Sequence, residues 1–368
     1  MAAPEKNNSA CHFSPISLKK NNIMKPKIIT KNDFGAWVDS LIKKVGVVGV
    51  KEKEAGKFHF APLETAAELR LDYDVTITPP KKFIQPPKEI LLMFEIGNDK
   101  FKAKAVIEAK ELVLLGVHPY DMKAINQMDK VFTDDNKETN YLERRKNITI
   151  IGVDPVNASK WGFWHDMGAA TVDKGFDLWL TDLGDRYYVE AGSKQGEKLL
   201  SSAKTNDAGK TDSELQKEAR LNLKSLCKPE RKVKATVNEL PSLFGNSYES
   251  TVWEEHAKKC YSCGSCNLVC PTCYCFDVRE DVDISLKSGR RIRYWDGCLL
   301  EDFAMVGHGD NFREERGDRF RHRLFRKYSY MVDKVGDIAC VGCGRCSSVC
   351  LPDITDPVKI INELKGGK

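Results

Sequence analysis

Short apolar runs alternate with amphipathic segments in the first half of the chain. The runs have the length and β-branched content of buried strands, and they lie at Ile90–Phe94, Leu112–Val117, Ile148–Val153 and Phe176–Leu180. Between them, Asp121–Val131 carries apolar residues at helical spacing. Because strands that alternate with helices favour a partly parallel sheet, we expect a small sheet of this kind and an α/β domain over residues 27–203.

One more helix is predicted before these runs. Apolar residues follow Asp33 at helical spacing, namely Phe34, Trp37, Val38, Leu41 and Val45. We expect this helix to reach Lys44, with Asp33 as its cap. The two proline pairs within residues 79–87 then predict an extended, stiff connector there.

The composition changes at both ends of this domain. Residues 204–232 are rich in Lys, Ser, Asp and Glu, with a polar helix at Asp212–Leu226, and we interpret them as a polar linker. Residues 1–26 carry lysines but lack the apolar segment of a secretory signal. We therefore expect a disordered extension there, with Met24 as an alternative start. Residues 233–368 form a second domain.

Two copies of one cysteine run dominate residues 233–368. In two-cluster ferredoxins, three thiolates of each run hold one [4Fe–4S] cluster and the fourth reaches the other cluster. The spacing therefore predicts two [4Fe–4S] clusters, close enough together to suit electron relay. The copies read Cys260-x2-Cys263-x2-Cys266-x3-Cys270-Pro271 and Cys340-x2-Cys343-x2-Cys346-x3-Cys350-Leu351-Pro352. We assign one cluster to Cys260, Cys263, Cys266 and Cys350, and the other to Cys340, Cys343, Cys346 and Cys270.

Other interpretations of the cysteines remain open. A zinc ribbon uses two CxxC pairs and has no need of the third cysteine, and it would make the chain a zinc-stabilised binding module without a redox role. Cys273, Cys275 and Cys298 could hold a further metal, tune the clusters, or form the substrate site of a self-contained reductase. They could equally be small buried hydrophobic residues. We regard Cys227 as incidental.

Composition narrows the classes of protein further. The chain has 368 residues, enough for two domains, and no apolar run of about 18 residues that would span a membrane. Most of its 13 cysteines lie within residues 260–350, which favours ligands over disulfides and a reducing, cytoplasmic location. The formal net charge is +5, and two clusters of about −2 each bring it close to neutral. Charge therefore gives no case for binding nucleic acid or a membrane.

The long segment between the two runs has helical character. Phe312–Tyr328 is basic, but Phe320, Leu324 and Tyr328 give it an apolar face. We expect this helix to pack on the cluster core, with its arginines offsetting cluster charge or docking a partner. Together the helices predict a helical type of two-cluster ferredoxin domain, not one built on hairpins. The helical patterns lie at Leu299–Val306, Phe312–Tyr328 and Tyr330–Val335.

Several segments, most of them outside the cysteine runs, resemble one family. They are Leu69–Pro80, Leu114–Asp121, Gly175–Gly192, Cys260–Val278, Trp295–Cys298 and Asn311–Arg323. In these segments the chain resembles the iron–sulfur β subunit of soluble sulfhydrogenases and the related A subunit of anaerobic sulfite reductase. The resemblance implies an electron-relay subunit without catalytic residues. It also implies two partners: a flavoprotein subunit that binds FAD and NAD(P)H, and a hydrogenase, sulfite reductase or heterodisulfide-reductase-like subunit.

The first domain departs from that family in one respect. Its members often carry extra cysteines there, whereas residues 27–203 of this chain have none. We therefore expect a metal-free domain that docks a partner, with Trp161 and Trp164 as contacts. The full expectation is an α+β chain: an N-terminal α/β domain followed by an α-helical two-cluster ferredoxin-type domain.

Overall fold

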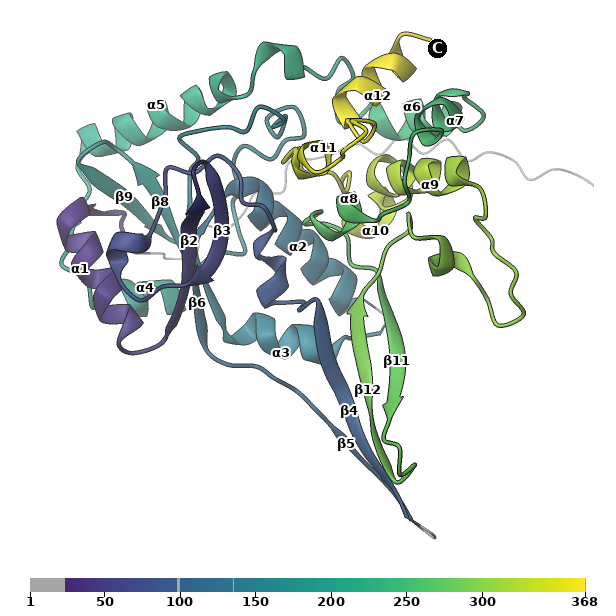
Figure 1. Ribbon diagram of the computed structural model, residues 1–368. Helices are drawn as coiled ribbons and strands as arrows, with labels where there is room; N and C mark the ends of the chain where they lie inside the picture. Colours follow the sequence, from purple (N-terminus) through teal and green to yellow (C-terminus); the bar gives the residue numbers. More distant parts are fainter. Residues whose placement is uncertain (1–23, 98–99, 135, 368) are drawn as a thin grey trace, which may run out of the picture.

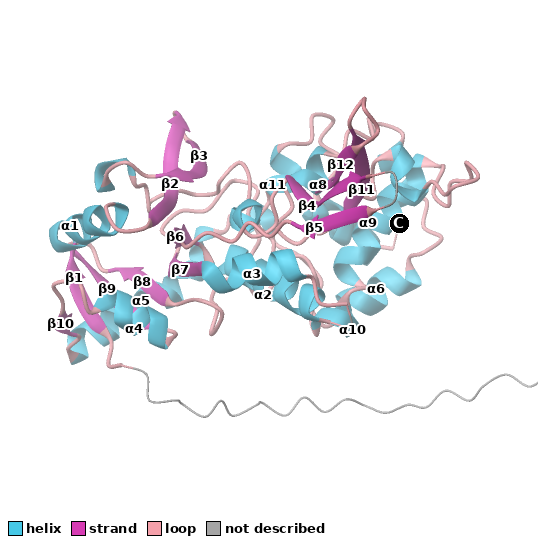
Figure 2. Ribbon diagram, turned by 90° about the horizontal axis from the view of Figure 1, so that it is seen from below, coloured by secondary structure: helices cyan, strands magenta, loops and turns pink. Residues whose placement is uncertain are grey.

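The computed structural model describes residues 24–97, 100–134 and 136–367. The extension expected at residues 1–26 therefore lies almost wholly outside the described residues. Figures 1 and 2 show two bodies side by side, a sheet covered by helices and a group of short helices. A narrow arm of strands extends away from both bodies in Figure 1.

In the described part of the chain, eight strands form one mixed sheet in the order β10-β1-β9-β8-β7-β6-β2-β3. Strands β2, β6, β7 and β8 run parallel to one another, and the outer pairs are antiparallel. This confirms a partly parallel sheet, and β6 and β7 have the predicted bounds. The strands are β1 (Lys27–Thr30), β2 (Gly46–Glu54), β3 (Lys57–Pro62), β6 (Leu112–Val117), β7 (Ile148–Val153), β8 (Leu178–Asp182), β9 (Arg186–Ala191) and β10 (Asn206–Asp207).

Both faces of this sheet are covered by helices. In β6, Val113 and Leu115 pack into the core on one face, and Leu114 and Val117 into the core on the other. Because successive side chains of a strand point to opposite faces, a strand covered on both sides is apolar throughout. One face is covered by α1 (Lys31–Ile42) and α4 (Lys194–Leu200), the other by α2 (Pro119–Thr133) and α3 (Thr139–Asn147).

The N-cap of helix α1 is Thr30 and not Asp33, the residue that was predicted. The Thr30 hydroxyl accepts a hydrogen bond from the backbone N–H of Asp33 at 3.1 Å, so Thr30 caps the helix and Asp33 lies in its first turn. The helix ends at Ile42, before the expected Lys44. Its buried face is as predicted, because Phe34, Trp37, Val38 and Leu41 are all buried.

The proline-rich connector is also different from the prediction. Pro80–Phe83 forms a short 3₁₀ helix, η2, in place of an extended segment. Pro80 fits its first position, since a proline there has a preset φ and its missing N–H is not needed. The turn buries Lys81, only 3% exposed, beside the cysteine-rich half of the molecule.

The region expected to be a polar linker contains a packed helix. Helix α5 (Lys210–Leu226) lies against β8 and β9, with Leu223 buried. Arg220 of this helix is 3.0 Å from the Asp154 carboxylate and 2.5 Å from that of Glu190. Residues 210–226 thus form part of the first body, and in Figure 1 the helix runs from β9 toward α12.

Short helices build the second body around an aromatic core. Phe244, Trp253, Phe320 and Phe325 meet there, and each is at most 2% exposed. None of the helices in the described residues is both long and apolar enough to cross a membrane. The helices are α6 (Leu240–Asn246), α7 (Val252–Ala257), α8 (Ser265–Leu268), α9 (Arg316–Tyr328), α10 (Val332–Val335), α11 (Arg345–Ser348) and α12 (Pro357–Lys365).

A β-hairpin lies in the segment between the two cysteine runs, ahead of the expected helices, although a domain without hairpins was predicted. Strands β11 (Phe276–Val282) and β12 (Ser288–Trp295) pair with β4 (Lys88–Ile96) and β5 (Phe101–Ala105) in the order β11-β12-β4-β5. The predicted strand Ile90–Phe94 therefore lies in this arm and not in the α/β sheet. Of the helical pattern at Leu299–Val306, only a 3₁₀ turn, η4 (Glu301–Ala304), forms. The arm unites residues that the sequence assigned to different domains.

A buried ion pair joins the two bodies. Arg345 of α11 lies within the second cysteine run, and its guanidinium donates two hydrogen bonds to the Asp121 carboxylate of α2, at 2.6 and 2.7 Å. Arg345 also donates to the hydroxyl and carbonyl of Thr76. Both charged side chains are at most 1% exposed. Such a pair fixes orientation, because each charge depends on the other.

Removing Asp121 should therefore be costly. In Asp121→Ala the Arg345 charge stays buried without its partner, and we expect a loss of about 3–5 kcal/mol in the free energy of unfolding. Urea denaturation followed by circular dichroism measures the change. Lys204→Ala is the control, because Lys204 pairs with Asp33 but is 86% exposed, and it should cost at most about 1 kcal/mol. Equal small losses in both variants would contradict the role of the buried pair.

Candidate metal centre

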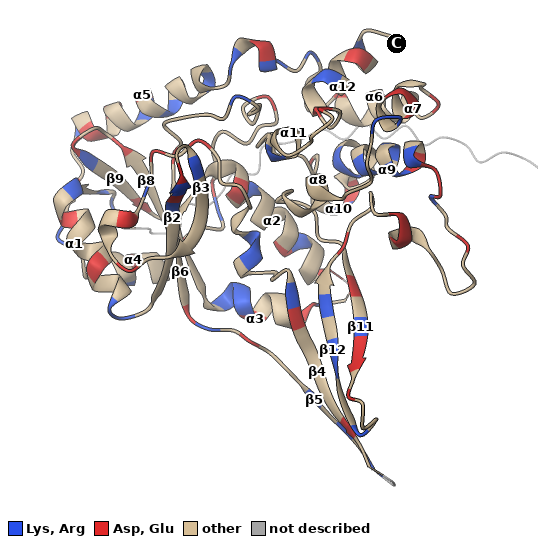
Figure 3. Cartoon of the chain, viewed as in Figure 1, with Lys and Arg blue, Asp and Glu red and all other residues tan. Residues whose placement is uncertain are grey.

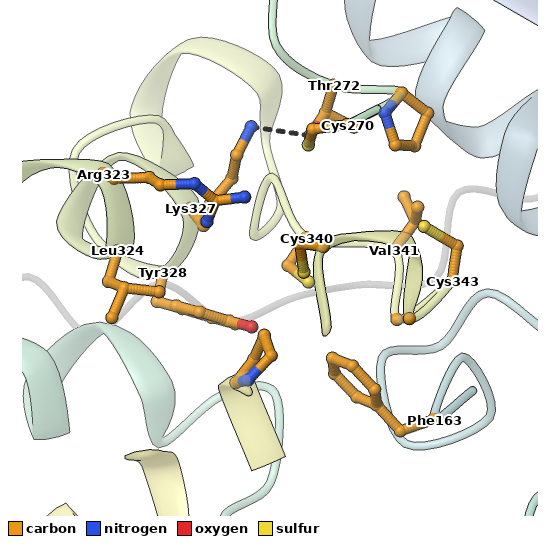
Figure 4. Close-up of a pocket in the computed structure, with 15 residues that line it drawn as sticks. Phe163, Cys270, Thr272, Arg323, Leu324, Lys327, Tyr328, Cys340, Val341 and Cys343 are labelled. Atoms are coloured by element: carbon orange, nitrogen blue, oxygen red, sulfur yellow. Dashed lines mark hydrogen bonds between the residues drawn. The ribbon is translucent and has the colours of Figure 1, made fainter. Parts of the chain in front are cut away.

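Cysteines from both runs line one cavity. Cys340, Cys343 and Cys346 of the second run meet Cys270 of the first around one small cavity. Figure 4 shows the side chains of Cys340, Cys343 and Cys270 around it, with Tyr328 at one side. The structure thus brings to one cavity the four residues that the spacing assigned to the second cluster.

The other four predicted ligands differ in their exposure. Cys260 and Cys266 are buried in the core of the second body, Cys350 packs against that core, and Cys263 is exposed. Burial raises the pKa of Cys266 to about 12, and Cys346, Cys350 and Cys260 act in the same direction. Cys266 is thus close to cysteines of both runs.

The two runs fold alike because they share a glycine. Gly264 and Gly344 each follow the second cysteine of their run, with φ of +69° and +78°, and each precedes a one-turn helix. Glycine adopts the left-handed conformation at this position with little cost in energy, because it has no Cβ. Helices α8 and α11 then contact one another. This repeated turn brings the two cysteine runs side by side.

Helix α9 places several positively charged side chains along the first cysteine run. Its apolar face, Phe320, Leu324 and Tyr328, is at most 1% exposed, which confirms the packed helix expected from the sequence. Figure 3 shows the basic residues along α9. The hydrogen bonds run from Arg316 to the Cys260 carbonyl (3.1 Å), Arg319 to the Ser262 hydroxyl (3.2 Å), Arg323 to the Cys266 carbonyl (2.9 Å) and Lys327 to the Thr272 hydroxyl (2.7 Å).

Three of the cations near the cysteines are buried without an acidic partner. In the described residues Arg323, Lys327 and Lys81 form no ion pair, and each is at most 7% exposed. Burial opposes the charge of Arg323, yet nearby cysteine thiolates, Cys266 foremost, raise its pKa well above the usual value. Burial lowers the pKa of Lys81 to about 8. Buried cations of this kind need a buried anion beside them.

The cavity and its surroundings fit a [4Fe–4S] cluster. Such a cluster with four thiolates is anionic, which suits the buried cations. The Tyr328 hydroxyl lies beside the Cys340 sulfur and can donate to it. Burial raises the pKa of Cys340 to about 11 and of Cys343 to about 12, so binding of iron must release protons from these thiols. In the described residues, no group of three or more Cys, His, Asp or Glu side chains is arranged to hold a single metal ion.

Comparison with known proteins agrees with this chemistry. Residues 259–354 match the 4Fe-4S dicluster domain family. The chain is 33% identical over 329 residues to sulfhydrogenase 2 subunit beta of Pyrococcus furiosus, covering 89% of this chain and 94% of that protein. This chain belongs to the sulfhydrogenase β subunit family. It is an iron–sulfur electron-transfer protein. No solved structure matches it.

In this member of the sulfhydrogenase β subunit family, the second cysteine run contacts the first body directly. Gly342 has φ of +67°, and a Cβ there would lie 2.5 Å from the Cα of Trp164 and 2.7 Å from the backbone of Phe163. The Phe163 N–H donates to the Gly342 carbonyl at 2.8 Å. Trp164 is only 1% exposed, so the prediction that it contacts a partner is wrong: it supports a cysteine loop instead. Trp161 is half-buried beneath Gly344.

Sequence reasoning missed two groups at this centre. Lys81 donates a hydrogen bond to the Cys273 carbonyl and lies 4.3 Å from the centre of the Trp295 ring. Asn267 donates to the sulfurs of Cys298 and Cys273, at 3.4 and 3.7 Å. Lysine is almost never buried, and an asparagine within a cysteine run is a common residue, so neither carried a signal.

The glycine contact gives a test of the cavity. Gly342→Ala puts a methyl group into the Trp164 backbone and strains a left-handed residue, which should displace Cys340 and Cys343. We expect the variant to lose about four iron atoms per chain, measured by iron analysis after anaerobic purification. Gly307→Ala is the matched control, because nothing lies within 4 Å of its Cβ position. An unchanged iron content in Gly342→Ala would show that the cavity holds no cluster.

Proposed function

We propose that this chain relays single electrons through two [4Fe–4S] clusters within a larger oxidoreductase complex of the reducing cytoplasm. One partner is a flavoprotein subunit that binds FAD and NAD(P)H. The other carries the catalytic or acceptor site and is a hydrogenase, sulfite reductase or heterodisulfide-reductase-like protein. The observation that carries the proposal is the cavity shared by the two cysteine runs, in a member of the sulfhydrogenase β subunit family.

Ligation across the two runs makes the relay short. We propose that Cys340, Cys343, Cys346 and Cys270 hold the second cluster, since all four line the same cavity. Cys260, Cys263, Cys266 and Cys350 then hold the first. Each run spans both sites, so the two clusters are neighbours and electrons pass between them inside one protein body.

The first site offers a face for a redox partner. Cys263 is exposed, and Tyr261 and Leu351 beside the two runs are 71% and 91% exposed. A groove opens next to Cys350 and is lined by Trp161 among others. We propose that one partner docks on this face, because exposed apolar side chains around a redox centre suit a protein contact. Electrons then pass between the first cluster and the second inside the same body.

The relay role predicts dependence on a flavoprotein. A hydride must be divided into single electrons before a cluster accepts them, and flavin performs this step. The purified chain should therefore not oxidise NADH or NADPH, yet it should bleach with dithionite. Addition of its flavoprotein partner with NAD(P)H should produce the same bleaching, followed by visible absorption. Oxidation of NAD(P)H by the chain alone would sink the proposal, as would a colourless protein that binds only zinc.

A further inference from the structure

A second cavity gathers the three cysteines that lie outside the two runs. Cys273 and Cys275 precede β11, and Cys298 follows β12. The pairing of these strands and a hydrogen bond from the Asp296 N–H to the Cys275 carbonyl at 3.1 Å close the base of the hairpin. All three cysteines line one small cavity. The hairpin thus assembles a set of thiols that the sequence spreads over two segments.

Asn267 links two of these thiols to the first run. Its side-chain amide donates to the sulfurs of Cys298 and Cys273, at 3.4 and 3.7 Å. Asn267 belongs to α8, and its side chain is 2% exposed. A Cβ on Gly297 would lie 2.8 Å from the Asn267 Cβ, so the chain before Cys298 is packed closely on it.

The walls of this second cavity are positively charged. Arg323, Arg326 and Lys327 line it, and Lys81 donates to the Cys273 carbonyl. None of its lining residues within the described ranges is a carboxylate. Small buried thiols that serve only as apolar filling have no need of cations, which are costly to bury. The surroundings therefore call for a bound group that carries negative charge.

The two cavities are neighbours. Thr272, Arg323 and Lys327 line both of them, so one wall separates the second cavity from the one that Cys270 shares with the second run. A redox group in the second cavity would lie next to the second cluster of the proposed relay. It would also lie at the base of the strand arm, because Cys275 and Cys298 flank the paired strands β11 and β12.

We propose that Cys273, Cys275 and Cys298 hold a third iron–sulfur cluster with three cysteine ligands. The proposal rests on the relay function above and extends it toward the arm. Three thiolates ligate three irons of a cuboidal cluster, and the cluster together with its thiolates is anionic, as the cation-lined walls require.

Metal and sulfide analysis of the full chain, purified without oxygen, tests the third cluster. We expect about eleven or twelve iron atoms per chain rather than about eight. Cys275→Ser and Cys298→Ser should each remove about three or four iron atoms and leave the EPR signals of the other clusters in place. Cys227→Ser is the matched control and should change nothing, because Cys227 lies outside both cavities.

Three results would overturn this inference. The first is about eight iron atoms in the wild type, which leaves the two-cluster relay intact. The second is a full iron content that neither Cys275→Ser nor Cys298→Ser lowers. The third is zinc at the three cysteines. A wild-type chain without iron would instead refute the relay function itself, so the two failures are distinct.

Discussion

Buried positive charge around the cysteine loops is the constraint on which the second body depends. Arg323, Lys327 and Lys81 come from two separate segments and converge on the loop from Cys266 to Cys273. Burial of each of these charges costs several kcal/mol of hydration free energy unless nearby groups compensate for it. Their bonds to carbonyls and a hydroxyl offset part of this loss, and an anionic cluster offsets the rest. Folding of this body and cluster binding are therefore coupled, as in other small metal-stabilised domains.

The first body holds the second cysteine run in place. Arg345 ties α11 to Asp121, and Gly342 lets the run lie against the backbone of Trp164. The α/β sheet presents both contacts at the start of α2 and in the segment after β7, near the carboxyl ends of its parallel strands, where α/β folds usually place their functional sites. The first body is thus a platform for cluster chemistry as well as a surface for partners.

The sequence predicted the parts that depend on local pattern. Continuous apolar runs predicted the positions of β6 and β7. The cysteine spacing predicted that Cys270 lies with the second run, and the two share a cavity. The sequence could not predict that β4 pairs with β12, because such pairing depends on partners far apart in the chain. The burial of Lys81 and Trp164 was missed for the same reason. Each is buried by contacts with a distant segment, and neither has a local signature.

Cross-ligation is the central claim, and EPR of two single variants tests it most directly. Cys350→Ser should alter the spectrum of the cluster held by Cys260, Cys263 and Cys266, although that residue belongs to the other run. Cys270→Ser should alter the spectrum of the cluster in the cavity that it shares with the second run. On full reduction the wild-type signals should broaden through mutual interaction, because the clusters are neighbours. If Cys350→Ser instead perturbs only the cluster of Cys340, Cys343 and Cys346, each run ligates its own cluster and the account is contradicted.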